Sequence, residues 1–177
     1  LLRDDVRGIR ARGVLLVGGG KLSAFDRRAY RKVSAHVAGL LEGSRATDAL
    51  TCLPGIAVRG VDADDRARVT VEATANRLYR FDEFRSEPNA PKHPLNRLTL
   101  HAVSREDKAA AEAGIAYARS LAAGVHLARD LANRPANVCT PTHLAEQARA
   151  LDSEYDRVHA TVLEESDMEQ LGIGSML

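Results

Sequence analysis

Apolar and polar positions near the N-terminus predict a strand, a turn and a helix. Residues 14–17 form an unbroken apolar run that ends in glycines, which is typical of a strand buried on both faces of a sheet. The following segment predicts a helix with Ser23 as its N-cap, Asp26 at the third helical position and Gly43 as its stop. The apolar face of that helix is expected to contain Phe25, Ala29, Val33, Val37, Leu40 and Leu41.

The same patterns predict a further strand, a helix and a third strand. Residues 49–58 favour a strand, although a Pro-Gly pair interrupts it. Residues 64–79 favour a helix, and its apolar face is expected to contain Ala67, Val71, Ala75, Leu78 and Tyr79. Residues 84–94 contain three prolines and few apolar side chains, so a loop is expected there. Residues 95–103 alternate between apolar and polar positions, as a half-buried strand does.

A long helix is predicted to connect two domains. Ser104 and Asp107 cap it, and its pattern rich in Ala and Leu continues without a breaker for roughly 40 Å at 1.5 Å per residue. Because one small domain does not need a helix of this length, we expect residues 104–134 to join two domains. These are an N-terminal α/β domain, residues 1–103, and the beginning of a second α/β domain, residues 135–177. The expected fold class is therefore α/β, with a mixed N-terminal sheet flanked by helices.

The last segment carries clear helix signals. Pro135 forces the preceding residue away from helical angles, and Thr140 with Pro141 predicts a new helix with a cap and a first-turn proline. Residues 158–163 alternate as a strand would. A capping box and a closing glycine predict a short final helix, at Ser166, Glu169 and Gly172.

The composition is that of a globular chain without a membrane segment. Of its 177 residues, 45% are hydrophobic and 28% are charged, which suffices to bury one core and part of a second. No apolar run approaches the roughly 20 residues that a membrane-spanning helix needs. Cys52 and Cys139 lack CxxC spacing, so we expect small buried residues in a reducing compartment. These features predict a cytoplasmic protein that does not contact a membrane.

Charge is distributed unevenly along the chain. The formal net charge is +1, yet residues 1–45 contain 10 Lys or Arg against 4 Asp or Glu. A solvated basic surface is the favoured interpretation, because aromatic residues that could stack on bases make up only 4% of the chain. The alternative is a DNA-binding module that uses this basic face, with Arg27, Arg28 and Arg31 as the contacts to test.

The glycine-rich stretch at residues 17–23 raises the question of phosphate binding. A P-loop needs glycine at position 15 and Ser or Thr at position 22, and both positions are leucine. The dinucleotide fingerprint matches at Gly18 and Gly20 but has Ser23 in place of its third glycine. We therefore favour glycines that allow a tight turn between strand and helix, with a nucleotide binder as the alternative.

Residue patterns alone do not assemble an active site. The six histidines are scattered, and only His126 and Asp130 are spaced to share one helix face, where a surface hydrogen bond is the favoured interpretation. No serine lies in a GxSxG elbow, and neither cysteine has a neighbouring histidine in the sequence. We therefore assign no catalytic, cofactor-binding or metal-binding residue within the chain.

Four stretches resemble the leucyl (cytosol) aminopeptidase family of dinuclear-metal exopeptidases. Residues 130–151, DLANRPANVCTPTHLAEQARAL, are similar to the junction that opens the family's catalytic domain. Residues 162–177 are similar to a later turn of that domain, with Ile173 where Met is usual. VLLVGGGK at 14–21 and YRFDEFRS at 79–86 resemble segments of the N-terminal domain. The matching C-terminal positions are Arg129, Leu131, Asn133, Pro135, Asn137, Thr140, Pro141, Leu144, Ala145, Leu171, Gly172, Gly174 and Leu177.

The resemblance implies a longer protein with a defined chemistry. It implies that the chain begins inside the N-terminal domain and stops before the segment whose lysine, aspartates and glutamate hold two divalent metal ions, Zn²⁺ or Mn²⁺. In the family, a water bridged by the two metals attacks the peptide carbonyl. The full-length protein is thus expected to remove N-terminal residues, Leu among the favoured ones, from peptides as a homo-hexamer.

For this segment, the resemblance implies a scaffold and oligomerisation role, with no metal bound and no activity on its own. Some bacterial members of the family also bind DNA. The basic N-terminal part keeps a DNA-contacting role open for this chain.

Overall fold

The computed structural model describes residues 2–4, 8–87 and 95–176 and divides the chain into two compact units. Unit 1 comprises residues 1–126, and unit 2 comprises residues 127–177. The boundary falls inside α3 (Arg105–Asn133), the long helix that the sequence predicts. The predicted domain limits at residues 103 and 134 stay predictions.

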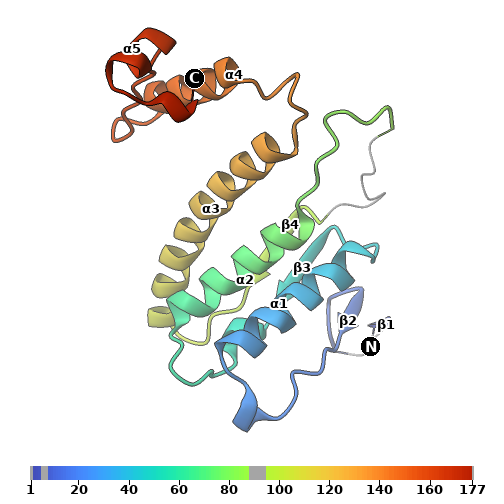
Figure 1. The fold of residues 1–177 in the computed structure, drawn as a ribbon. Coiled ribbons are helices and arrows are strands. Elements are labelled where there is room, and N and C mark those ends of the chain that lie inside the picture. Colours follow the sequence, from blue (N-terminus) through green and yellow to red (C-terminus); the bar gives the residue numbers. More distant parts are fainter. Residues whose placement is uncertain (1, 5–7, 88–94, 177) are drawn as a thin grey trace. The chain divides into compact units, whose positions relative to one another are not determined.

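Unit 1 contains two strand pairs and alternates strands with helices (Figure 1). Its elements before α3 are β1 (Leu2–Asp4), β2 (Gly13–Leu15), α1 (Arg27–Glu42), β3 (Asp48–Thr51), α2 (Ala63–Leu78) and β4 (Arg97–Leu100). β1 and β2 are antiparallel, with Leu2 opposite Leu15. β3 and β4 are parallel, with Asp48 opposite Arg97, so α2 is the crossover helix of a βαβ unit. The α/β fold class is confirmed.

The predicted strands are present but shorter than their apolar runs. The strand predicted at 14–17 is not buried on both faces, because among the described strands β2 pairs with β1 alone and Leu16 is 58% exposed. The strand predicted at 49–58 ends at Thr51, since Pro54 lies in a 3₁₀ turn, Leu53–Gly55, and its ring suits the first turn of such a helix. β4 shows the predicted alternation of exposed and half-buried side chains.

α1 begins three residues later than predicted. Asp26, not Ser23, is its N-cap, and its Oδ1 accepts a hydrogen bond from the Ala29 backbone N–H at 2.8 Å. Ser23 lies in a 3₁₀ turn, Leu22–Ala24, and Phe25 has a ψ of 83°, through which a helix cannot continue. The predicted stop at Gly43 is confirmed, because Gly43 is the C-cap.

Phe25, Leu41 and Ala67 are buried as predicted, but the rest of the buried stripes of α1 and α2 is displaced from the predicted positions. In α1 the buried residues are Tyr30, Ser34, Ala38 and Leu41. In α2 they are Ala67, Val69, Thr70 and Ala73. Two small residues, Ser34 and Ala38, lie where the apolar pattern pointed to larger neighbours. They allow α2 to approach α1 closely, and the stripe follows that contact rather than the most apolar residues.

α3 and α4 (Pro141–Glu154) confirm the cap predictions. The Asp107 backbone N–H donates to Ser104 Oγ at 3.0 Å, and the His143 backbone N–H donates to Thr140 Oγ1 at 3.2 Å. Pro141 occupies the first turn of α4, as predicted.

Two predictions for the last segment are wrong. No strand forms at residues 158–163, because no described segment pairs with it. The capping box of α5 (Glu165–Gln170) consists of Glu164 and Asp167 instead of Ser166 and Glu169. Acidic side chains at both positions suit the positive N-terminal end of the helix. Gly172 follows α5 with a φ of +70°, as a closing glycine does.

Cys52 and Cys139 were expected to be buried, and neither is. Cys52 is exposed and Cys139 is partly buried, and both are free thiols. Cys52 precedes the Pro54 turn, which carries its side chain to the surface. Among the described residues, no helix is both long enough and apolar enough to cross a membrane.

The core of unit 1 lies between α1 and α2, which run side by side (Figure 1). Tyr30 is fully buried, and its hydroxyl lies 2.8 Å from Thr70 Oγ1. Phe25 meets the Tyr30 ring edge to face, with ring centroids 6.1 Å apart. Val58, Val61 and Val69 complete the buried cluster. Burial of each such side chain contributes about 1.5–3 kcal/mol to folding.

Ion pairs join α1 to α2 at both ends. At the N-terminal ends, Arg27 binds Asp65 through two hydrogen bonds of 2.7 and 2.9 Å, and Arg68 adds a third of 2.7 Å. At the C-terminal ends, Glu42 pairs with Arg77 and Arg80. Because like ends of the two helices are paired, α1 and α2 run in the same direction. The guanidinium of Arg27 is the main cause that lowers the pKa of Asp65 to about 2.

α3 packs closely on the beginning of α2. A Cβ placed on Gly114 would lie 2.3 Å from the backbone oxygen of Asp64. The Arg68 guanidinium also lies over the Tyr117 ring, 5.2 Å from its centroid. Gly114 therefore allows the two backbones to meet, and the residues around it hold α3 in place.

We predict that Gly114→Ala destabilises unit 1 by about 1–3 kcal/mol, because the added methyl group overlaps the Asp64 carbonyl. Gly124→Ala in the same helix is the matched control, since a Cβ there meets no atom within 4 Å. The control is expected to be neutral or more stable by up to about 1 kcal/mol, because alanine favours helix. Urea unfolding of both variants measures the difference. Equal stability of the two variants would contradict the close packing.

We predict that Asp65→Asn lowers the free energy of unfolding at pH 7 by about 2 kcal/mol. The Asp65 pKa is lowered on folding, so its contribution is complete above about pH 4 and is lost as the pH falls towards 2. The difference between wild type and variant should therefore shrink over that range. Asp48→Asn is the control, because its exposed pair with Arg97 should contribute at most about 1 kcal/mol. A difference independent of pH would refute the prediction.

Candidate functional site

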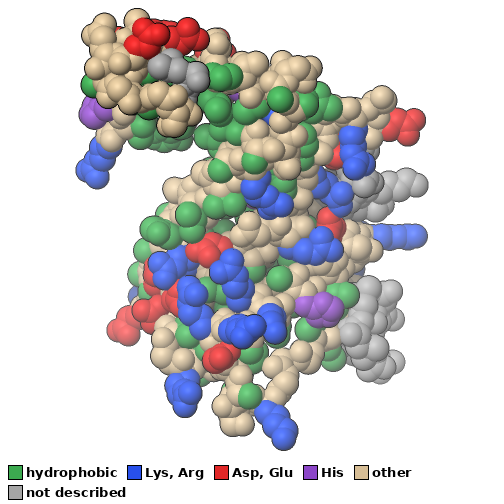
Figure 2. All heavy atoms as spheres, in the orientation of Figure 1, with side chains coloured by type: hydrophobic (Ala, Val, Ile, Leu, Met, Phe, Trp, Pro, Cys, Tyr) green, Lys and Arg blue, Asp and Glu red, His purple; other side chains and the backbone are tan. Residues whose placement is uncertain are grey.

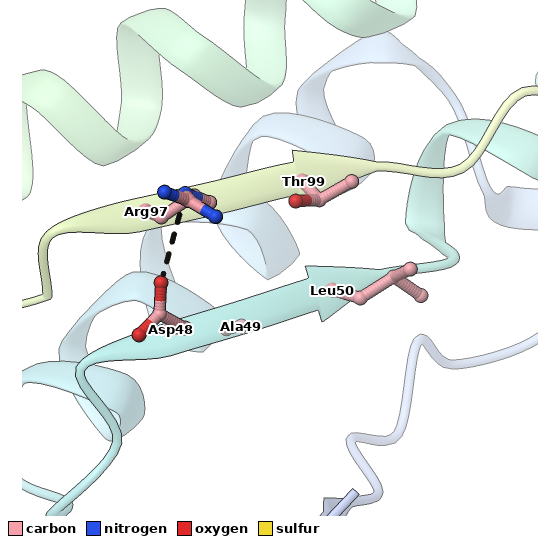
Figure 3. A pocket seen from close by; sticks show the side chains of 5 residues that line it. All are labelled: Asp48, Ala49, Leu50, Arg97 and Thr99. Carbon is pink, nitrogen blue, oxygen red and sulfur yellow. Dashed lines mark ion pairs between the residues drawn. The ribbon is translucent and has the colours of Figure 1, made fainter. Parts of the chain in front are cut away.

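The β3–β4 pair carries a shallow hollow lined by five residues (Figure 3). Asp48 and Arg97 point toward one another across the two strands, with 3.7 Å between Oδ1 and Nε. Leu50, on the same face, is 64% exposed. The two charges are exposed and neutralise each other. This face therefore offers an open sheet surface without a group prepared for catalysis.

The glycine-rich stretch is an irregular segment and does not form the start of α1. Residues 16–21 have no regular structure, and the Leu22–Ala24 turn and Phe25 separate them from the helix. Gly20 has a φ of +84°, which favours glycine, and a Cβ on Gly19 would lie 3.2 Å from the Phe25 ring. The glycine loop therefore does not supply the free backbone N–H groups at the N-terminal end of α1. The glycines thus lie in the connection between strand and helix, but residues 16–26 make that connection longer than the tight turn that the sequence predicted.

A second hollow lies at the N-terminal end of α1 and is lined by arginines. Its lining residues, which we call the arginine hollow, are Asp26, Arg27, Arg28, Arg31, Arg59, Gly60 and Val61. The structure thus brings together the three arginines that the sequence singles out, and adds Arg59. Figure 2 shows Lys and Arg side chains gathered over the region of α1 and α2.

Buried valines position Arg59 against α1. Val58 and Val61 form a bridge that encloses Arg59 and Gly60, and the Val61 backbone N–H donates to the Val58 oxygen at 3.1 Å. Gly60 has a φ of +71°, which the turn requires. Both valines belong to the same buried cluster as Tyr30. One core therefore sets both walls of the arginine hollow.

Sequence reasoning did not find Arg59. It is separated from the other arginines by β3 and a 3₁₀ turn, so no spacing rule connects it to α1. A signal was present in Val-Arg-Gly-Val, residues 58–61, where two apolar residues flank a turn pair. Only the packing of that turn against α1 reveals the cluster.

The charges of the arginine hollow are only partly compensated. Arg27 is bound by Asp65, and Asp26 accepts the capping hydrogen bond of α1. Arg28, Arg31 and Arg59 are exposed, and within the described part of the chain they have no ion-pair partner. The hollow can therefore attract an anion.

The other sequence candidates do not converge on a site. His126 stacks near Tyr79, with ring centroids 5.0 Å apart, and its Nε2 is buried without a hydrogen-bond partner among the described residues. His126 belongs to unit 1 and Asp130 to unit 2. Within residues 2–4, 8–87 and 95–176, no three His, Cys, Asp or Glu side chains are grouped so that they could hold a metal ion. These residues do not fit a dinuclear metal site.

The motif residues of the C-terminal part lie at the junction of α3 and α4. Asn133 is the last residue of α3, Pro135 follows it, and Thr140 caps α4. Across this junction, Arg134 Nη1 and His143 Nε2 are 2.8 Å apart. The junction is thus a fixed connection of two helices within unit 2.

Comparison with known proteins identifies the two parts of the chain. The family model described as the cytosol aminopeptidase family, N-terminal domain, matches residues 3–88. The model for the catalytic domain of the same family matches residues 126–177. The two matches follow the order of the two domains.

Individual proteins agree with these matches. The whole chain aligns with the cytosol aminopeptidase of Pseudomonas aeruginosa at 42% identity but covers only 35% of that protein. The Mn complex of the bottromycin maturation enzyme BotP is similar over 87% of this chain and 30% of that chain, with 29% identity and a TM-score of 0.66. A mutant of tomato leucine aminopeptidase is similar over 82% of this chain and 28% of that chain, with 25% identity and a TM-score of 0.67.

The chain thus spans about a third of the length of the curated relatives that it matches. The motifs at residues 14–21, 79–86 and 130–151 fall within or across the regions that the family models match. The two matches together cover most of the chain, in the expected order. The chain therefore belongs to the cytosol aminopeptidase family, and its residues 3–88 and 126–177 match the N-terminal and catalytic domains of that family.

Proposed function

We propose that this chain supplies the N-terminal part of an aminopeptidase that hydrolyses N-terminal residues, Leu among the favoured ones, from peptides. The observation that carries the proposal is the ordered match to both domains of one family. Relatives named cytosol aminopeptidase and leucine aminopeptidase support it. In this proposal the segment acts as scaffold and oligomerisation region of a homo-hexamer.

Two divalent metal ions, Zn²⁺ or Mn²⁺, would activate water in the whole protein. The Mn complex of BotP supports manganese as one of the candidates. Because no described side chains of this chain are grouped as metal ligands, the proposal places the metal ligands outside them. The contribution of the described residues is then to position metal ligands that lie outside them.

The packing of unit 2 supports a larger catalytic domain. None of the described side chains in residues 127–175 is buried, and several large apolar ones are exposed, namely Leu144, Tyr155, Val158, Leu163 and Leu171. A unit of this kind has no core of its own, and so many exposed apolar side chains favour cover by another segment or subunit.

We predict that a chimera regains peptidase activity where the chain alone has none. In the chimera, this chain replaces the matching first third of the Pseudomonas aeruginosa enzyme. With added Mn²⁺ it is expected to hydrolyse leucyl-p-nitroanilide, and a chelator is expected to abolish the activity. Sedimentation measures whether it assembles as the parent enzyme does. An assembled but inactive chimera would contradict the proposed function, and chelator-sensitive activity of the 177 residues alone would contradict the location of the metal ligands.

A second proposed function is contact with DNA through the basic face of unit 1. The arginine hollow favours it, because Arg28 and Arg31 are exposed and available to phosphates. Arg27 is less suitable as a test than the sequence suggested, because its replacement also removes the pair with Asp65.

We predict that the chain retards duplex DNA at low salt and that Arg28→Ala/Arg31→Ala weakens this binding. Loss of two phosphate contacts should make the plot of log affinity against log salt less steep by about 2. Arg119→Ala/Arg149→Ala is the control with the same charge change, at exposed positions outside the hollow. Absence of retardation at low salt, or an equal effect of both double variants, would exclude this function for the hollow.

A further inference from the structure

We propose that the arginine hollow binds a phosphate monoester group in its dianionic form. The inference is independent of peptide hydrolysis and of DNA contact. It rests on the placement of charge at α1, on the turn that carries Arg59, and on the net charge that the hollow presents.

The first turns of α1 carry positive side chains, which are unfavourable at the N-terminal end of a helix. The N-terminal end of a helix is positive, so acidic side chains are favoured in its first turn. α2 and α3 follow this rule, with Asp64 and Asp65 in one and Glu106 and Asp107 in the other. α1 has no acidic residue in its first turn and instead has Arg27 and Arg28, with Arg31 one turn later. A bound anion would relieve this repulsion.

The turn at residues 58–61 completes the arrangement. It adds Arg59 from a different segment, and the buried Val58 and Val61 fix its backbone relative to α1. Guanidinium groups from two elements therefore face one hollow. Planar guanidinium groups bind phosphate oxygens in pairs, with a fixed geometry that a lysine does not provide.

The charge balance of the hollow selects the ligand. Arg27 is paired with Asp65, a carboxylate that it shares with Arg68. The other charged lining residues are Arg28, Arg31 and Arg59 against the carboxylate of Asp26. These four residues together carry two net positive charges. A phosphate monoester carries about −1.5 to −2 at pH 7 and balances them. A phosphodiester of a nucleic-acid backbone carries a single charge and leaves one arginine uncompensated.

The size of the hollow favours an ester over phosphate alone. The hollow is open to solvent and has a volume of about 500 Å³, so it has room for an organic substituent beside one phosphate group. Val61 contributes an apolar part of the wall, against which an organic substituent can pack. Inorganic phosphate and a phosphomonoester both present a dianionic phosphate group. A comparison of their binding shows which of the two is the ligand.

The test is thermal unfolding of the whole chain with four additives at equal ionic strength. These are inorganic phosphate, phenyl phosphate, the monoanionic diester dimethyl phosphate, and sodium chloride. At about 20 mM, we expect both dianions to raise Tm by about 3 °C or more over chloride. A larger shift with phenyl phosphate identifies an ester as the ligand, and equal shifts identify free phosphate. Dimethyl phosphate should produce no shift.

Variants assign the effect to the arginine hollow. Arg59→Ala and, independently, Arg28→Ala should each abolish the shift, and Arg119→Ala, at an exposed position of α3, should retain it. The second hollow variant covers the case in which one of the two fails to fold. With phenyl phosphate, the shift over chloride should also decrease between pH 7.5 and 5.5, because this monoester loses its second charge near pH 6.

Three outcomes would overturn the proposal. These are a shift with dimethyl phosphate as large as with phosphate, a full shift in both hollow variants, and no shift with either dianion. If the chain retards DNA but neither dianion shifts Tm, this inference fails and the DNA-contacting function stands. Conversely, if the dianions raise Tm but the chain does not retard DNA, this inference holds and the DNA-contacting function fails.

Discussion

The parallel packing of α1 against α2 is the interaction on which the rest of unit 1 depends. Tyr30 brings its ring and its hydroxyl to the middle of this contact, where Thr70 satisfies the hydroxyl. Burial raises the pKa of Tyr30 to about 12, so the side chain stays neutral under all physiological conditions. The same contact places Val58 and Val61, and through them the Arg59 turn. A surface feature is therefore determined by a buried one.

Arg66 shows how α2 also organises the segment before it. Its Nε donates to the Pro54 oxygen at 2.7 Å and its Nη1 to the Val61 oxygen at 2.8 Å. Two loop carbonyls thus accept hydrogen bonds from one partly buried guanidinium. Because β3 leads directly into this loop, Arg66 connects the sheet, the loop and the helix that follows.

Local signals predicted the helices of this chain well and their contacts poorly. The caps at Ser104 and Thr140 depend on a few adjacent residues, and both were predictable. The α1 cap failed because Ser23 and Asp26 are both good caps, and the burial of Phe25 decides between them. The prediction of a strand at 158–163 was wrong because an alternating pattern forms a strand only where a partner strand pairs with it, and the pattern does not show whether one is present. Arg59 required three-dimensional packing, which no spacing in the sequence expresses.

The absence of any buried side chain among the described residues 127–175 bears on the synthesis of the protein. Unit 1 can close its core as soon as α2 and the first turns of α3 have left the ribosome, because domains fold as units from the N-terminus. The stretch after residue 126 gains no such protection from its own residues. It therefore stays accessible to chaperones and proteases until another segment or subunit covers it, and limited proteolysis of nascent chains should cut there first.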